Sequence, residues 1–482
     1  MSARAAAAGA RALRLGSVPA RAVFLKGSCF IARLGFRPPR EQGEYRGKGR
    51  KTLRASTMGC CDLKCWLIAG TVVGAIACLA GLILIPVGNM VIEGTVKKEA
   101  VLQPGTTAYK NWISAGAPLY RQMWLFDVQN PEEVVRNGSV PVLKQRGPYT
   151  YRTRYIPKEN VTFNDNYTVS FLLPAGAIFE PSMSVGTEED IVTSLNLAVA
   201  GAYNLIDHKL ANMLIQLSKS TLFQSRTVRE MLWGYKDPML KSIMGLFYPY
   251  NNTFDGPYNV FTGQDDTNKV SVIDNWQNRP SVLYWNDTYC NMINGTGELP
   301  LPFSFIENLN VQWSVYAEYV NSLDLKGITV YRFMLPQSIF ASPTVNLDNK
   351  CFCTNYEVTN NCTMAGVLDI KACKGAPVFI SLPHFLHGSP ELLQTVNGLN
   401  PDPEEHSTFL DVEPITGFTL RVSKRLQVNM VYGPSKDIKI LNQVKQITMF
   451  PLVWLNETAS LDDETADMIK RELFSRMGML ET

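Results

Sequence analysis

Residues 65–92 read CWLIAGTVVGAIACLAGLILIPVGNMVI, a run of 28 residues without a charged side chain. A helix needs roughly 20 apolar residues to cross a bilayer, so this stretch predicts one transmembrane helix, which we place at 66–92. A helix buried in a soluble domain rarely runs this long without a polar face. A cleaved signal sequence is the other alternative, but its apolar region usually spans only about 7 to 15 residues.

The charges on either side of this helix predict its orientation. Residues 50–64 carry four basic side chains and one acidic one, whereas residues 93–99 carry two of each. The positive-inside rule therefore leaves the N-terminus in the cytosol. The segment 93–470 is then predicted to be an ectodomain, facing the outside or a lumen.

The composition indicates a folded protein with a basic extension. The 482 residues are 46% hydrophobic and 18% charged, and residues 1–65 hold 14 Lys and Arg against 3 acidic residues. The remaining residues hold 32 against 40, so the folded part lacks the basic surface that nucleic acid requires, and we expect no nucleic-acid partner. Within segment 1–57, residues 1–40 hold seven Arg, one Lys and no acidic residue, which is the composition of a mitochondrial transit peptide. The apolar span and the sequons favour the secretory route instead, so we predict a disordered extension and a functional start at Met58.

Eight Asn-x-Ser/Thr sequons follow the span and none precedes it. N-linked glycans are added in the secretory pathway, so this distribution agrees with the predicted ectodomain. A glycan also requires a surface loop, so a single sequon can stay unoccupied. The predicted sites are Asn137, Asn160, Asn166, Asn251, Asn286, Asn294, Asn361 and Asn456.

Five of the ten cysteines lie between residues 290 and 373. Clustered cysteines in an oxidising compartment indicate a disulfide module. Cys351 and Cys353 should have different partners, because residues this close together are poorly placed to pair with each other. A zinc site is the alternative, although the usual knuckle spacing is missing. Since five is an odd number, one thiol stays free or pairs between chains.

Three further cysteines, Cys60, Cys61 and Cys65, lie at the cytosolic edge of the span. Such positions are common sites of reversible S-acylation, here palmitoylation, so 58–65 is predicted to be a short acylated segment; reduced thiols without a role are the alternative. Within the span, Gly70-x-x-x-Gly74 forms a stripe of small residues that favours a homodimer.

Beyond the span, short β-patterned stretches punctuated by Pro and Gly dominate, with one helical interval. No repeat or linker divides 93–482, which favours one large domain. The helical interval is Ser194–Gly234, where the apolar residues recur at helical spacing. The predicted strands lie at 144–155, 169–179, 328–335, 378–382 and 418–432.

No pattern supports an enzyme. His384-Phe-Leu-His387 and His406 could be considered as metal ligands, but their spacing is not that of a helical metal pair, and a structural role is favoured. No phosphate-binding loop, dinucleotide fingerprint or nucleophile elbow is present in the sequence. We therefore predict no catalytic residue, no cofactor and no metal.

Several long motifs resemble the class B scavenger receptors, and within them the fatty acid translocases. The resemblance extends from Met58 to about residue 470. It rests on motifs long enough to exclude chance, including WLFDVQNP at 124–131, KQRGPYTYR at 144–152, GAIFEP at 176–181, GLFYPYNNT at 245–253, SLPHF at 381–385 and EPITGFTL at 413–420.

This resemblance implies an α+β fold class, mainly antiparallel β. The ectodomain would have an irregular β-barrel core, a helical apex at 194–234 and a lipid tunnel. The resemblance also implies a receptor of the plasma membrane, present in Golgi and membrane rafts, that facilitates lipid uptake. Its partners would be long-chain fatty acids, oxidised low-density lipoprotein, anionic phospholipids and thrombospondin.

The resemblance implies roles for particular residues as well. Lys219 would contact anionic ligands at the apex, and Glu159 would lie in the tunnel region. Cys290 would pair with Cys351, and Cys353 with Cys362.

The chain departs from the family pattern at several places. Leu217 stands where the family has a second apex lysine, and the partner expected for Cys373 is replaced at about Gln312, so Cys373 is predicted to be free. Segment 471–482 is an atypical tail in which the family's second spanning helix is missing. Two alternatives to a lipid receptor follow, namely an adhesion or signalling receptor for thrombospondin-type proteins and a truncated paralogue with weakened transport.

Overall fold

The computed structural model describes residues 63–114, 119–154, 156–248, 250–293, 295, 316–414, 417 and 419–471. It begins with helix α1 (Leu63–Glu99), and the segment Ile68–Gly88 of α1 is long and apolar enough to cross a membrane. The helix continues past the predicted end at residue 92, and Lys97 and Lys98 lie in its last turn, where basic side chains stabilise the helix dipole. The predicted extension 1–57 and most of segment 58–65 lie outside the described residues.

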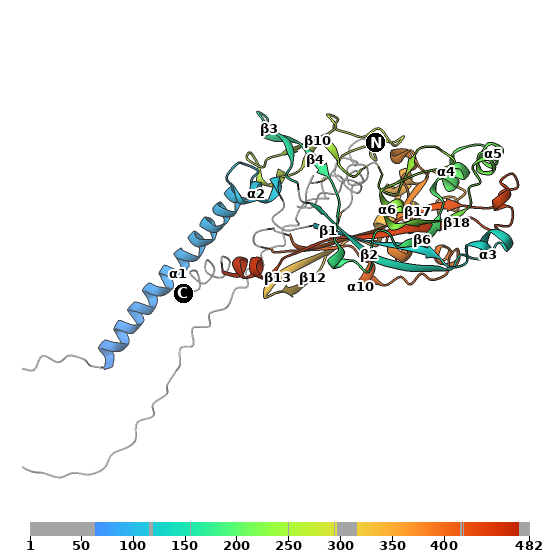
Figure 1. Cartoon of the computed structure of the whole chain (residues 1–482). Helices are drawn as coiled ribbons and strands as arrows, with labels where there is room; N and C mark the ends of the chain where they lie inside the picture. The colour runs from blue at the N-terminus through green and yellow to red at the C-terminus, as the bar shows by residue number, and fades with distance from the viewer. Residues whose placement is uncertain are drawn as a thin grey trace, which may run out of the picture. The chain divides into compact units, whose positions relative to one another are not determined.

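The described residues from Val87 onward form one compact unit of helices and antiparallel strands (Figure 1). The α-helices of this unit are α2 (Thr107–Ile113), α3 (Pro131–Asn137), α4 (Leu197–Leu205), α5 (His208–Ser218), α6 (Val228–Trp233), α8 (Lys371–Lys374), α9 (Pro390–Gln394) and α10 (Pro403–His406). The first strands are β1 (Leu119–Val128), β2 (Leu143–Arg154), β3 (Glu159–Asn164), β4 (Thr168–Ala175), β5 (Ile178–Phe179), β6 (Ile191–Leu195), β7 (Phe223–Thr227), β8 (Tyr235–Lys236) and β9 (Ile243–Met244). The later strands are β10 (Thr253–Phe261), β11 (Ile273–Trp276), β12 (Glu318–Leu325), β13 (Ile328–Met334), β14 (Leu368–Asp369), β15 (Val378–Ser381), β16 (Phe409–Val412), β17 (Thr419–Tyr432) and β18 (Thr448–Ser460).

The largest sheet of the unit has ten strands, with the main path β12-β13-β16-β17-β18-β1-β2-β5 and the pair β14-β15 joined to β17. All of its strand pairs are antiparallel. The long central strands β17 and β18 run together from Arg421 opposite Ser460 to Tyr432 opposite Thr448. Most of β18 is buried on both faces, so its sequence reads as a continuous apolar run rather than as an alternating one.

The strand predictions agree with this topology. The segment 144–155 corresponds to β2, 169–179 to β4 and β5, 328–335 to β13, and 378–382 to β15. The alternating stretch 418–432 forms the single strand β17. The mixed helix and antiparallel-sheet class is therefore confirmed.

The predicted helical interval Ser194–Gly234 is only partly correct. It contains α4, α5 and α6, but Ser194 lies in β6 and Phe223–Thr227 forms β7, which pairs with β6. Leu195 lies opposite Phe223, and both side chains are buried. Two short segments about 30 residues apart form this pair, and their strand state depends on a partner that local periodicity does not reveal.

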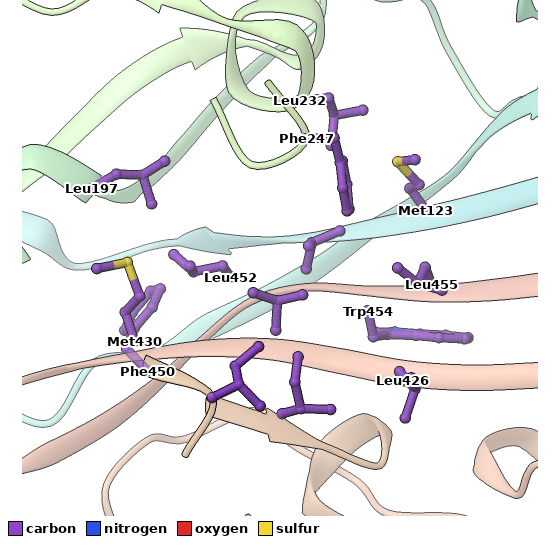
Figure 2. Close-up of a cluster of buried hydrophobic side chains, with 14 of the residues drawn as sticks. Met123, Leu197, Leu232, Phe247, Leu426, Met430, Phe450, Leu452, Trp454 and Leu455 are labelled. Carbon is purple, nitrogen blue, oxygen red and sulfur yellow. The ribbon is translucent and has the colours of Figure 1, made fainter. Parts of the chain in front are cut away.

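The hydrophobic core lies on the central strands of the large sheet. Figure 2 shows Met430, Phe450, Leu452 and Leu455 together with Leu197 above them. Phe450, Leu452 and Leu455 are at most 1% exposed. The large sheet therefore offers an apolar surface on which α4 packs against β17.

Two buried carboxylates of the large sheet also form ion pairs with arginines on neighbouring strands. Arg121 on β1 lies opposite Glu457 on β18, and its Nε donates a hydrogen bond of 2.5 Å to Glu457 Oε1. Asp411 is fully buried, and its oxygens accept hydrogen bonds from Arg332 at 2.7 and 2.8 Å and from Arg421 at 2.7 Å. These guanidinium groups lower the pKa of Asp411, although burial by itself would raise it.

Candidate functional site

Helix α5 presents apolar side chains on two faces. Ala211 and Ile215 are buried against the unit, whereas Leu210, Met213 and Leu217 are 44%, 50% and 76% exposed. The exposed residues recur at intervals of three and four, so they lie along one outward-facing stripe. We call Leu210, Met213, Leu217 and the following Lys219 the α5 stripe. It is an apolar surface that ends in a cation.

The position of Lys219 follows from the way α5 ends. Lys219 is the C-cap residue, has the left-handed backbone conformation (φ 55°, ψ 32°), and its N–H donates to the Gln216 carbonyl at 3.2 Å. Its side chain is exposed. A cation at a helix C-terminus is favoured by the helix dipole. The predicted apex cation therefore lies on the surface, two residues after the most exposed member of the stripe.

The first turn of α5 is fixed to neighbouring segments. Asp207 accepts hydrogen bonds from the N–H groups of Lys209 (3.0 Å) and Leu210 (3.2 Å) as the N-cap. His208 Nε2 donates to the Tyr203 carbonyl at 3.1 Å, so its Nδ1 accepts from the Ser435 hydroxyl at 3.0 Å. These contacts hold the helix on α4 and on the loop between β17 and β18.

Sequence reasoning identified Lys219 but missed the outward direction of the stripe. Met213 and Leu217 were predicted only as members of an apolar pattern with helical spacing, and the pattern did not assign them to a face. The sequence does contain a signal for an exposed apolar face, because the apolar residues at positions 210, 213, 214, 215 and 217 cover more than one face of a helix.

Glu159 does not belong to the same site as Lys219. It is exposed in β3, opposite Leu172 of β4. Strand β3 and helix α5 lie at opposite ends of the unit (Figure 1). A role for Glu159 near a tunnel stays a prediction.

The disulfide module joins the two cysteine pairs that the family resemblance implied. Cys290 is bonded to Cys351 with a Cα–Cα distance of 6.4 Å, and Cys353 to Cys362 with a distance of 5.7 Å. Cys290 and Cys351 therefore offer no thiolates to a zinc ion at Asp287, the nearby carboxylate.

Cys373 is a free thiol and is partly buried. Its S–H donates to the Ile370 carbonyl at 3.1 Å, and burial raises the pKa of the thiol to about 11. A thiol with this pKa is almost entirely protonated near neutral pH, so Cys373 is a poor nucleophile. Gln312, the proposed replacement of its partner, lies outside the described residues.

Five of the predicted glycosylation sites are exposed: Asn137, Asn160, Asn166, Asn286 and Asn361. Asn251 is half-buried, and its side-chain oxygen accepts a hydrogen bond from the Ala177 N–H at 3.0 Å. Asn294 lies outside the described residues.

Asn456 is different, because it lies within β18 and is only 9% exposed. Its amide nitrogen donates to Gln122 at 3.0 Å, and its oxygen accepts from Ser423 at 2.5 Å. The folded chain therefore does not present Asn456 as a surface acceptor, and we remove it from the proposed glycan sites.

Of the three predicted palmitoylation sites, the structure describes only one, and only by its backbone. Cys60 and Cys61 lie outside the described residues, and Cys65 lies in the first turns of α1. Acylation stays a prediction at all three positions.

His384 and His406 have the structural role that their spacing favoured. Their rings stack with centroids 4.4 Å apart. His384 Nε2 contacts Gln145 Oε1 at 2.6 Å, and His384 Nδ1 accepts from the Asn400 N–H at 3.0 Å. Burial lowers the pKa of His384 to about 3 and that of His406 to about 4. Both rings are therefore neutral at physiological pH.

The described residues line two notable hollows. One is an open groove of about 1270 Å³ next to the end of α1, and the other is a pocket of about 260 Å³ between Glu357 and Glu391. Neither is lined by Lys219 or Glu159.

Comparison with known proteins connects this architecture to a receptor family. A model of the CD36 family matches residues 72–482. "Scavenger receptor class B member 1" of Cricetulus griseus is 34% identical over 436 residues, which cover 85% of this chain and 84% of the relative. "Lysosome membrane protein 2" of Rattus norvegicus is 33% identical over 403 residues, which cover 79% of this chain and 82% of the relative.

Proposed function

Since this chain belongs to the CD36 family of receptors, we propose that it is a cell-surface scavenger receptor that binds long-chain fatty acids and oxidised lipoproteins. Two of its most similar relatives carry different names, one as a scavenger receptor and one as a lysosomal membrane protein. The chain aligns with more than four fifths of each of these relatives. The family therefore supports membrane attachment and a receptor role for this chain, whereas the identity of its ligands is what we propose.

The observation that carries the proposal is the α5 stripe. Long-chain fatty acids and oxidised phospholipids combine an anionic group with an acyl chain. The stripe offers exposed Leu210, Met213 and Leu217 next to the exposed ammonium of Lys219. Burial of acyl carbons contributes about 0.8 kcal/mol for each CH₂ group, so the apolar part supplies affinity and the cation selects the anionic end.

The route for lipid uptake is the less direct part of the proposal. By analogy with the family, lipid would pass from the ectodomain surface through an interior tunnel of an irregular barrel toward the membrane. The proposed location is the plasma membrane, with Golgi and membrane rafts as further sites.

Exposed sequons and two disulfides support an ectodomain outside the cytosol. Thrombospondin binding, recognition of other anionic phospholipids and a homodimer through α1 stay predictions. The glycines Gly70, Gly74 and Gly81 have open space around them in the described chain, which is compatible with close approach of a second helix.

The proposal is tested by photolabelling the full chain in amphipol with a diazirine-bearing long-chain fatty acid. We expect saturable labelling that unlabelled oleate prevents, because a specific lipid site has a fixed capacity. Peptide mapping then locates the site. Labelling that rises linearly with probe concentration and resists competition would contradict a fatty acid receptor and favour the adhesion alternative.

The contribution of the cation is predicted from Lys219→Ala. We expect it to weaken binding of oxidised low-density lipoprotein roughly three- to tenfold and binding of free fatty acid less, because a particle presents many anionic groups at once. Surface plasmon resonance on the immobilised full chain measures both. Lys209→Ala is the matched control, since Lys209 is exposed on the same helix at its other end.

The reverse change strengthens the test. Leu217→Lys adds a second cation beside Lys219 and should increase binding of oxidised lipoprotein relative to the unmodified chain. Equal losses for both ligands in Lys219→Ala, or the same loss in Lys209→Ala, would contradict the assigned role of Lys219.

A further inference from the structure

The groove next to the end of α1 is built from three segments of the chain, at 97–106, 167 and 263–268. It has a volume of about 1270 Å³ and is lined by the last turn of α1, by the turn at 101–106, by Tyr167 at the tip of the β3–β4 hairpin, and by the loop 263–268. We call it the juxtamembrane groove. It was not foreseen from the sequence, because its segments are far apart along the chain.

Hydrogen bonds connect the walls of this groove. The Leu102 N–H donates to the Thr262 carbonyl at 2.8 Å, and the Thr262 N–H donates to the Tyr167 carbonyl at 2.8 Å. Glu99 Oε2 accepts from the N–H and the hydroxyl of Thr107, both at 2.9 Å. These contacts fix the turn after α1 to the hairpin and to the loop, so the groove is a built feature of the ectodomain.

The last turn of α1, which forms one wall of this groove, follows shortly after the apolar part of the helix. Lys97 follows Ile92, the last residue of the uncharged run, by five residues. A helix rises 1.5 Å per residue, so Lys97 lies about 7 to 8 Å along the helix axis beyond the end of the uncharged run. The headgroup region of a bilayer extends over a similar distance from the hydrocarbon core. A lipid headgroup is therefore the ligand that the membrane brings closest to the groove.

Both signs of charge line the juxtamembrane groove. Lys97 and Lys98 are exposed at the end of α1. The loop contributes Asp265, which pairs with Lys269 at 2.8 Å, and Asp266, whose Oδ1 accepts from the Asn268 N–H at 3.0 Å. Tyr167 is 52% exposed. Cationic, anionic and aromatic groups thus line one hollow.

This combination matches a zwitterion better than a simple anion. Two lysines would attract any phosphate, but the Asp266 carboxylate, which unlike Asp265 has no lysine in an ion pair with it among the described residues, would repel a lipid with a net negative charge. A quaternary ammonium, in contrast, is attracted both by carboxylates and by the face of an aromatic ring. We propose that the juxtamembrane groove binds the phosphocholine headgroup of a membrane lipid, with the phosphate beside Lys97 and Lys98 and the ammonium beside Asp266 and Tyr167.

The test uses the full chain in nanodiscs that contain a phosphatidylcholine probe with a diazirine close to the glycerol. We expect labelled peptides from 97–106 or 262–268 and at least threefold less labelling in Asp266→Asn. Asparagine can still cap the turn at 267–269, so this change removes the charge and keeps the fold. Millimolar free phosphocholine should also reduce the labelling. This readout needs no fatty acid or lipoprotein and is independent of the proposed uptake function.

Matched variants and a second lipid make the outcome decisive. Glu404→Gln removes an exposed carboxylate on α10 and should leave labelling unchanged, as should Lys371→Gln on α8. Lys98→Gln should lower it. The proposal is overturned if a phosphatidylglycerol probe labels these peptides as strongly as phosphatidylcholine, because contact with the lysines alone would then explain the result. It is also overturned if Asp266→Asn has no effect while thermal unfolding shows an intact fold.

Discussion

Replacing Arg121 by Met should lower the free energy of unfolding by about 3 to 5 kcal/mol, because it leaves a buried carboxylate without its cation. Glu457 is fully buried, and Arg121 is 5% exposed and donates directly to its Oε1. Burial raises the pKa of Glu457, and the positive charge of Arg121 opposes that rise. Denaturant unfolding of the full chain in detergent, followed by tryptophan fluorescence, measures the change.

The same substitution should make stability depend on pH in a defined direction. Without Arg121 the folded pKa of Glu457 rises further above the value in the unfolded chain. A group with a raised folded pKa stabilises the fold below its unfolded pKa, and this contribution is lost as pH increases through the folded pKa. The loss caused by Arg121→Met should therefore be larger at pH 7 than at pH 5.

Two further variants separate the buried pair from a general charge effect. The double variant Arg121→Met, Glu457→Leu should recover most of the lost stability, because no charge is then left in the interior. Lys326→Met removes one partner of an ion pair whose Asp463 side chain is 92% exposed, and it should change stability by less than about 1 kcal/mol. A double variant as unstable as Arg121→Met would contradict this account.

Acidification should destabilise the unit through the stacked pair His384 and His406. Both rings are buried, and burial lowers their pKa values to about 3 and about 4. In the unfolded chain, histidine titrates near pH 6.5. Between pH 6.5 and 4 the unfolded chain therefore binds protons that the folded chain does not, and stability falls as the pH falls. At pH 5 the loss is about 2 kcal/mol for each histidine.

The variant His406→Asn tests this effect. His406 Nδ1 accepts a hydrogen bond from the Asp402 N–H at 2.9 Å, and an asparagine oxygen can accept from the same donor without titrating. The difference in unfolding free energy between pH 7 and pH 5 should shrink by about half of the histidine contribution, or about 2 kcal/mol. Asp402 and Arg425 act on His406 in opposite directions, so neither cancels the effect of burial. An unchanged difference would show that other groups cause the acid sensitivity.

Much of the architecture could be predicted because it depends on local properties of the chain. The uncharged run 65–92 identifies a membrane helix by its length, and β2, β13, β15 and β17 follow from alternation and β-branched residues. Where a segment depends on a distant partner, prediction failed. Phe223–Thr227 lies inside the interval that apolar spacing predicted as helical, but it forms a strand that pairs with β6.

The candidate sites also divide into features that the sequence reveals and features that depend on folding. The sequence identified Lys219 as a cation and the sequons as polar loop signals, because charge and motif can be read directly from the order of residues along the chain. It did not reveal that Asn456 is buried in β18, because that follows from hydrogen bonds to Gln122 and Ser423 on neighbouring strands. The juxtamembrane groove was hidden for the same reason, since it joins segments at 97–106, 167 and 263–268.

The sequence by itself determined the membrane helix, the antiparallel character of the ectodomain, the family and the identity of the charged residues. These properties depend on composition, periodicity and motifs along the chain. Only the tertiary structure decided which of these charges meet and which are exposed. Arg121 and Glu457 are 336 residues apart along the chain, yet they form a buried pair because the register of β1 and β18 places them opposite each other. Burial then sets their energetics, since the strength of an electrostatic interaction depends on the surroundings that folding creates.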